Sequence, residues 1–170
     1  ASASNPRIHL THVARENPMT PPMLCMLMRK HLLGNKILGI TQQGFDRVLR
    51  LDLEGRNEMG DICTKSIITE IMGRHSNIIL IDENGRIMDS AKHVDFTVSA
   101  VRQILPGLLY EAPPAQDKYA PDHYSLLDLM TALDKSPEDT LLDKFLLASF
   151  TGMSPLLARE IVYRFFQNTK

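Results

Sequence analysis

Apolar and polar residues alternate in short stretches along the first half of the chain, which is the pattern of half-buried β-strands. These stretches cover residues 7–12, 36–43, 46–52, 63–72 and 78–88. Several residues of the 63–72 stretch are β-branched, which favours a strand over a helix there. The pattern therefore predicts five or six antiparallel strands.

Two turns between these strands are marked by glycine. Gly44 separates two of the stretches and predicts a hairpin. Asn84 and Gly85 separate an apolar run from its return strand. Asn-Gly is the strongest short hairpin signal, because both residues of the expected turn need a positive φ.

One helix is predicted before the first hairpin. Thr20 can cap its start, and the two prolines that follow are tolerated in a first helical turn. Residues 23–28 are apolar almost all round, so we expect a buried helix. The basic residues 29–31 suit a helix C-terminus, and Gly34 provides a natural stop.

The pattern changes after Arg102. Residues 105–121 are proline-rich and predict an irregular connector, because proline blocks both helical and ladder hydrogen bonds. Helical periodicity follows, first over residues 125–130. We therefore expect a β-rich domain with its connector over residues 1–121 and a helical region over residues 122–170.

The last part of the chain predicts two helices joined by a short turn. Ser136 and Pro137 suit the start of the first helix, which should run to Phe150. The turn at residues 151–155 and the helix after it resemble the helix–hairpin–helix of nucleic-acid-binding proteins, whose free backbone N–H groups can bind phosphate. Ser154 stands where that motif usually has its second glycine, so a hairpin used only for packing is the alternative.

Composition is that of a globular protein, with 44% hydrophobic and 23% charged residues. The net charge of −1 is far from that of a strongly basic nucleic-acid binder, although both ends of the chain are basic. No apolar run approaches the ~18 residues of a membrane span, and no secretory leader is recognisable. These features favour a cytoplasmic protein that does not bind membranes.

Known catalytic and metal-binding patterns are missing from the sequence. Cys25 and Cys63 lie far apart and outside any C-x-x-C pattern, which excludes a cysteine-rich zinc site. No phosphate-binding glycine loop, metalloprotease motif or nucleophile elbow occurs. We therefore expect no enzymatic activity, no cofactor and no metal.

Several polar residues occur where a strand or a simple turn is expected. They are Asp46, Arg47, Glu70, Arg74, His75 and Asn77. An arginine held by a neighbouring carboxylate presents a planar fork that suits phosphates and base edges. Histidine and asparagine add donors and acceptors that match base edges or ribose. A structural role stays open as the alternative: a turn ion pair at 46–47 and capping of a strand end at 74–77.

Long blocks covering nearly the whole chain resemble the NFACT family, in that family's order. They are RIHLT from Arg7, NPMTPPMLCMLMRKHL from Asn17, GFDRVL from Gly44, EIMGRHSNIILID from Glu70, LPGLLYEAPPAQDK from Leu105 and the hairpin LLASFTGMSPLLAREIVYR. The resemblance implies an α+β fold. It would be an antiparallel β-sandwich-like domain similar to the N-terminal domain of formamidopyrimidine DNA glycosylases, followed by a helix–hairpin–helix.

The resemblance also implies RNA partners. The family includes the bacterial RqcH proteins, which bind stalled large ribosomal subunits and tRNA, and recruit alanyl-tRNA so that the ribosome adds an alanine tail to the trapped chain. The family's Asp-Arg pair, implicated at the tRNA anticodon region, matches Asp46 and Arg47. Its Glu-Ile-Met block matches Glu70, Ile71 and Met72.

Two other functions are open. Members of the family were long labelled fibronectin-binding protein A, so an adhesin that binds fibronectin at the bacterial cell surface is the main alternative. A DNA-repair enzyme is the other, although the glycosylase reaction needs an N-terminal proline that this chain does not present. The family's domain begins upstream of Ala1 and continues into a coiled coil, so we expect a fragment that binds ribosomes poorly by itself.

Overall fold

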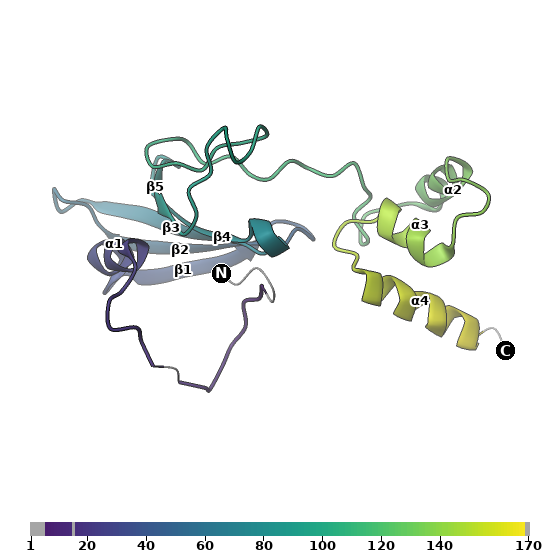
Figure 1. Ribbon diagram of the computed structural model, residues 1–170, viewed down its shortest axis with the longest axis horizontal. Helices are drawn as coiled ribbons and strands as arrows, with labels where there is room; N and C mark the ends of the chain where they lie inside the picture. The colour runs from purple at the N-terminus through teal and green to yellow at the C-terminus, as the bar shows by residue number, and fades with distance from the viewer. Residues whose placement is uncertain (1–5, 15, 169–170) are drawn as a thin grey trace. The chain divides into compact units, whose positions relative to one another are not determined.

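The chain forms two compact units, and the computed structural model describes residues 6–14 and 16–168 (Figure 1). The first unit is Ala1–Gln43 with Arg47–Pro113, and the second is Gly44–Asp46 with Pro114–Lys170. The first unit holds the sheet and one α-helix, and the second holds the other helices. No helix among the described residues is long and apolar enough to cross a membrane.

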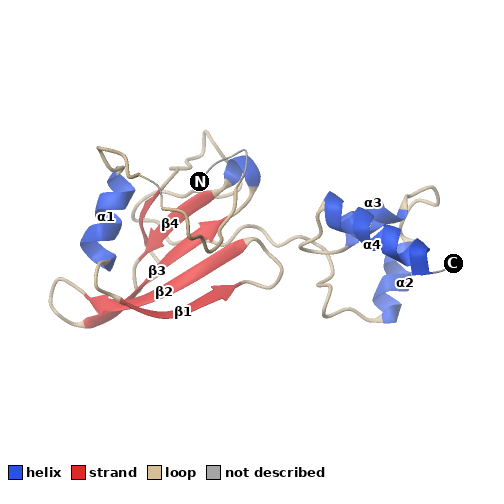
Figure 2. Cartoon of the chain, turned by 90° about the horizontal axis from the view of Figure 1, so that it is seen from below, coloured by secondary structure: helices blue, strands red, loops and turns tan. Residues whose placement is uncertain are grey.

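Five antiparallel strands form a single sheet in the first unit (Figure 2). They are β1 (Lys36–Gln42), β2 (Val48–Arg56), β3 (Ile62–Glu70), β4 (Asn77–Ile81) and β5 (Ile87–Ser90). Each strand pairs with the next one in sequence, so the order in the sheet is β1-β2-β3-β4-β5. The strands predicted from residue 36 onward are confirmed. The second layer of a sandwich is absent from the described residues.

The core of this unit lies on one face of the sheet. Ile68 pairs with Ile79 across β3 and β4, and both are almost completely buried. Ile104, from the segment that follows β5, belongs to the same cluster, so this segment covers that face. Side chains of successive strand residues point to opposite faces, so Ile78 lies on the other face, which is lined by helix α1 (Met23–Leu32).

Helix α1 differs from its prediction in burial and in its start. No residue of the helix is buried, although it contacts β2 and β5. Pro22 is the cap residue and no side chain caps the helix, so Thr20 does not have the predicted role. The expected burial is wrong because, among the described residues, the helix packs against the sheet on one side only. Its predicted end is confirmed by the basic last turn and by Gly34, whose φ is 81°.

Residues 7–12 form no strand, although the sequence predicts one. Every residue of the stretch is exposed and has irregular backbone structure. Alternation of apolar and polar residues favours a strand only where a neighbouring strand completes the ladder of hydrogen bonds. No described strand pairs with this stretch.

The turn between β4 and β5 is not the predicted two-residue type. Gly85 has a φ of 75°, whereas no described residue other than glycine has a positive φ. The Asp82 carboxylate accepts hydrogen bonds from the N–H groups of Asn84 at 2.9 Å and Arg86 at 2.8 Å. The Asp82 carboxylate therefore organises a longer loop, in which only Gly85 has a left-handed backbone conformation.

The second unit contains α2 (Leu126–Asp134), α3 (Leu142–Ser149) and α4 (Pro155–Asn168). The start of α2 is a capping box. Ser125 Oγ accepts from the Asp128 N–H at 3.1 Å, and Asp128 accepts from the Ser125 N–H at 2.8 Å. The helix predicted over residues 125–130 is therefore confirmed, with four further residues.

Helix α3 starts later than predicted. It begins at Leu142 without a side-chain cap, so Ser136 and Pro137 do not open it. The Thr140 N–H donates to the Pro137 carbonyl at 2.9 Å and closes a turn before the helix. Helices α3 and α4 contact each other through a short connection, in which Gly152 has a φ of 69°.

Candidate nucleic-acid interface

Two of the candidate segments meet at one end of the sheet. Val48 begins β2 directly after Arg47 and pairs with Glu70, the last residue of β3. Glu70 pairs in turn with Asn77, the first residue of β4. The Ile71 N–H donates to the Arg47 carbonyl at 2.8 Å and extends the ladder by one bond. The backbone at Arg47 and the β3–β4 connection therefore lie side by side.

The β3–β4 connection is a tight turn, the 3-10 helix η1 (Gly73–His75), in which Gly73 has a φ of 55°. The buried Ser76 hydroxyl donates to the Gly73 carbonyl at 2.7 Å and accepts from the Met72 N–H at 2.9 Å. These bonds close the loop on itself. The arginine and the histidine of η1 consequently stand exposed at its tip.

The exposed side chains at this end of the sheet are cationic or rich in hydrogen-bonding groups. Arg47 is exposed. Arg74 Nε donates to His75 Nε2 at 2.9 Å, which leaves the other nitrogens of the guanidinium open to solvent. Lys92 adds an ammonium that donates to the Arg74 carbonyl at 2.9 Å. We call Arg47, Arg74, His75 and Lys92 the basic end of the sheet.

Asn77 has a structural role in this arrangement. It is 1% exposed, and its amide exchanges hydrogen bonds with the backbone of Lys92, donating at 2.8 Å and accepting at 3.0 Å. The Ile78 N–H donates to the same oxygen at 2.9 Å. The predicted direct contact of Asn77 with RNA is therefore not available in this conformation.

Glu70 is also inaccessible, with 0% of its surface exposed. Arg102 Nη2 donates to one carboxylate oxygen, and the Tyr110 hydroxyl donates to the other at 3.0 Å. Both oxygens are thus used inside the protein. Ile71 and Met72 are half-buried, and Met72 packs against the hydrophobic core.

The donors to Glu70 keep their protons. Burial raises the pKa of the Tyr110 hydroxyl, and the Glu70 charge and hydrogen bond raise it further. Burial lowers the pKa of Arg102, but the hydrogen bond and charge of Glu70 outweigh it and raise that pKa overall. The carboxylate therefore has two permanent donors at physiological pH.

Three of these residues carried no signal in the sequence. Arg102 and Tyr110 lie 32 and 40 residues from Glu70 along the chain, and no periodic pattern connects them. Lys92 follows β5 in an irregular stretch, where a lysine is usually read as a solvated surface residue. Only the packing of the segment after β5 brings them to this end of the sheet.

The turn between α3 and α4 has fewer free donors than a phosphate-binding hairpin. Ser154 Oγ accepts from the Leu157 N–H at 3.1 Å and thereby caps α4. That N–H group would otherwise be free to bind a phosphate. The structure thus favours the packing role for this hairpin.

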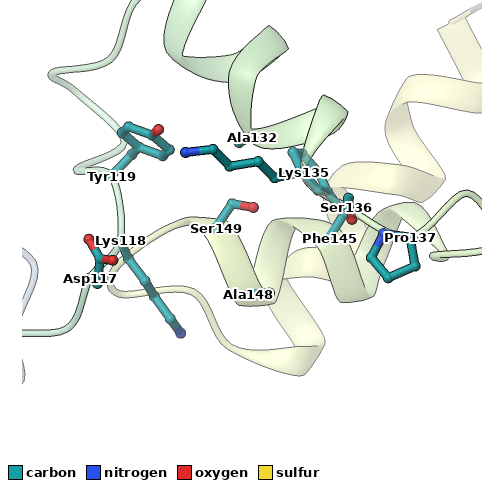
Figure 3. A pocket seen from close by; sticks show the side chains of 10 residues that line it. All are labelled: Asp117, Lys118, Tyr119, Ala132, Lys135, Ser136, Pro137, Phe145, Ala148 and Ser149. Atoms are coloured by element: carbon teal, nitrogen blue, oxygen red, sulfur yellow. The ribbon is translucent and has the colours of Figure 1, made fainter.

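A cavity of about 440 Å³ lies in the helical unit, between the connector and helices α2 and α3 (Figure 3). Lys135 extends across it toward Tyr119. Lys118 turns away and donates from Nζ to the Leu147 carbonyl at 2.9 Å. Asp117 also lines the cavity, so its charge is mixed and favours no single class of ligand.

Comparison with known proteins identifies the family. The model of the NFACT N-terminal and middle domains matches residues 1–170. The chain belongs to the NFACT family. The membership implied by the sequence blocks is therefore confirmed.

Relatives within the NFACT family have different names. The chain is 45% identical over 165 residues to the Rqc2 homolog RqcH of Bacillus subtilis (strain 168). The aligned region covers 96% of this chain and 29% of that relative, so the chain spans less than a third of its length. Its structure is similar to that of the N-terminal domain of the fibronectin-binding protein PavA from Streptococcus pneumoniae, with a TM-score of 0.85 and 33% identity. The match covers 99% of this chain and 62% of the PavA chain. It is also similar to the N-terminal part of the fibronectin/fibrinogen-binding protein of Streptococcus suis, with a TM-score of 0.78 and 36% identity. That match covers 89% of this chain and 56% of the Streptococcus suis chain.

Proposed function

We propose that this chain is an RNA-binding part of a ribosome-associated quality-control protein. It would bind tRNA, in particular alanyl-tRNA, and stalled large ribosomal subunits, and so support alanine tailing of trapped nascent chains. The names of its RqcH relatives support this proposal. The role of the chain would be binding, with the ribosome supplying the chemistry.

The observation that carries the proposal is the exposed Arg47 beside the η1 turn. An exposed guanidinium suits a phosphate, because its planar fork can donate two parallel hydrogen bonds to the phosphate oxygens. Arg74 and His75 add a second cation and a ring that can stack on an unpaired base. Proteins recognise single-stranded or loop regions of RNA through groups of these kinds.

Co-sedimentation with purified large ribosomal subunits tests the proposal in the full-length protein. Replacement of both arginines, Arg47→Ala with Arg74→Ala, should abolish salt-sensitive pelleting and weaken tRNA binding without unfolding the protein. Each lost phosphate contact should reduce the slope of log affinity against log salt by about one. Arg56→Ala is the matched control, because Arg56 is an exposed arginine at the opposite end of β2. Equal binding by the double variant and the control would contradict the proposal.

Fibronectin binding is the second candidate, and the names of the structural neighbours favour it. It would depend on protein–protein contacts and little on Asp46 or Arg47. A solid-phase assay with immobilised fibronectin, run on wild type and Arg47→Ala, separates the two functions. The implied likeness to the N-terminal domain of formamidopyrimidine DNA glycosylases stays a prediction about fold, and an incision assay on oxidised-base DNA tests whether any repair activity accompanies it.

A further inference from the structure

A buried charge network lies directly beneath the basic end of the sheet. Glu70 is completely buried, and the side chain of its partner Arg102 is 13% exposed. Arg102 also donates from Nη1 to the Glu111 carbonyl at 2.6 Å, and its guanidinium lies 5.9 Å from the centroid of the Tyr110 ring. The network therefore ties the segment after β5 to the last residue of β3.

Glu70 is connected to both halves of the basic end through the backbone. Val48 pairs with it on one side, directly after Arg47. Ile71 follows it, donates to the Arg47 carbonyl and leads into the η1 turn. A shift of Glu70 would consequently change the spacing between Arg47 and the turn.

We propose that Arg102 and Tyr110 are positioning residues for RNA binding, which hold Glu70 and thereby set the distance between Arg47 and the Arg74–His75 tip. This inference rests on the proposed function. Glu70 itself acts through position and does not touch RNA.

The choice of a buried ion pair supports a geometric role. Apolar residues of similar volume fill a core at least as stably as a buried ion pair, so stability does not explain why charges are present. A planar guanidinium with a carboxylate and a hydroxyl allows one arrangement, whereas apolar side chains tolerate several. Phosphate groups along RNA have a defined spacing, so a site built from separate loops needs such a restraint.

Two conservative variants test the inference in the full-length protein. Tyr110→Phe removes one hydroxyl and keeps the ring, and Arg102→Lys keeps the charge but loses the planar fork. The probe is a fluorescently labelled alanine tRNA transcript, titrated at several salt concentrations. Arg86→Gln is the matched control, because Arg86 donates from Nη1 to the Gly107 carbonyl at 3.0 Å and ties the same segment to the opposite end of the sheet. Thermal melts of all variants confirm that each is folded at the assay temperature.

We expect Tyr110→Phe and Arg102→Lys to weaken tRNA binding roughly two- to tenfold, and Arg86→Gln to bind as wild type does. The salt slope should stay that of the wild type, because neither variant loses a phosphate contact. Arg47→Ala should lower the slope by about one. Arg102→Lys added to Arg47→Ala should cost less than it does alone, since one member of the spaced pair is already gone.

The outcomes separate the inference from the function on which it rests. If Arg47→Ala binds tRNA as wild type does, the proposed function fails and the inference fails with it. If Arg47→Ala binds weakly while Tyr110→Phe and Arg102→Lys bind normally, the function stands and the inference is overturned. A lowered salt slope in Arg102→Lys would also overturn it, because Arg102 would then be a contact residue.

Discussion

Removal of the guanidinium from the buried network should destabilise the first unit strongly. Arg102→Met keeps most of the aliphatic stem and leaves Glu70 buried without its charge partner. The carboxylate has 0% exposure and would retain only the hydrogen bond from Tyr110 at 3.0 Å. Breaking a buried ion pair on one side costs about 3–5 kcal/mol, and we expect a loss of unfolding free energy in this range.

An exposed ion pair of the same sheet provides the reference against which the loss of unfolding free energy in Arg102→Met is compared. Arg50 and Asp52 pair at 2.8 Å, with side chains 49% and 25% exposed, so Arg50→Met should cost only about 0.2–1 kcal/mol. Urea denaturation of both variants, followed by circular dichroism, measures the two losses. The double variant Glu70→Gln with Arg102→Met should be more stable than Arg102→Met, because the uncompensated charge is gone. An equal loss in Arg102→Met and Arg50→Met would refute the reasoning that burial makes the Glu70 pair costly to break.

Two further predictions concern a turn and the acid side of the stability profile. Gly85→Ala should cost about 1–2 kcal/mol in urea denaturation, because the residue has a φ of 75°, whereas Gly39→Ala, with open space and no positive φ, should be close to neutral. Burial raises the pKa of Asp52, but hydrogen bonds from Ser66 and Arg50 outweigh it and lower that pKa overall. The resulting stabilisation is present above about pH 4 and is lost as the pH falls through the lowered pKa. In Ser66→Ala, the unfolding free energy should therefore decrease less between neutral and acidic pH than it does in wild type. An unchanged dependence of unfolding free energy on pH would contradict this.

Local patterns in the amino-acid sequence were sufficient to predict most of the secondary structure. Alternation from residue 36 onward and the glycine turn at Gly44 were sufficient for the strands of a sequential antiparallel sheet, since hairpins need only neighbouring residues. Helical periodicity likewise predicted α2, whereas its capping box at Ser125 was recognised only in the structure. The polar residues of the EIMGRHSN stretch marked a candidate site, but the sequence did not distinguish its exposed members from its buried ones.

The exposure of the candidate residues depends on contacts between distant parts of the chain. Arg74 and Asn77 are three positions apart, yet the first is exposed and the second is buried, because Ser76 closes the η1 turn between them. Glu70 is buried because Arg102 and Tyr110 reach it from far along the chain. Long-range contacts of this kind leave no periodic signal, since loop closure brings together residues whose spacing in sequence is arbitrary. The same limit explains residues 7–12, whose alternating pattern finds no neighbouring strand among the described residues.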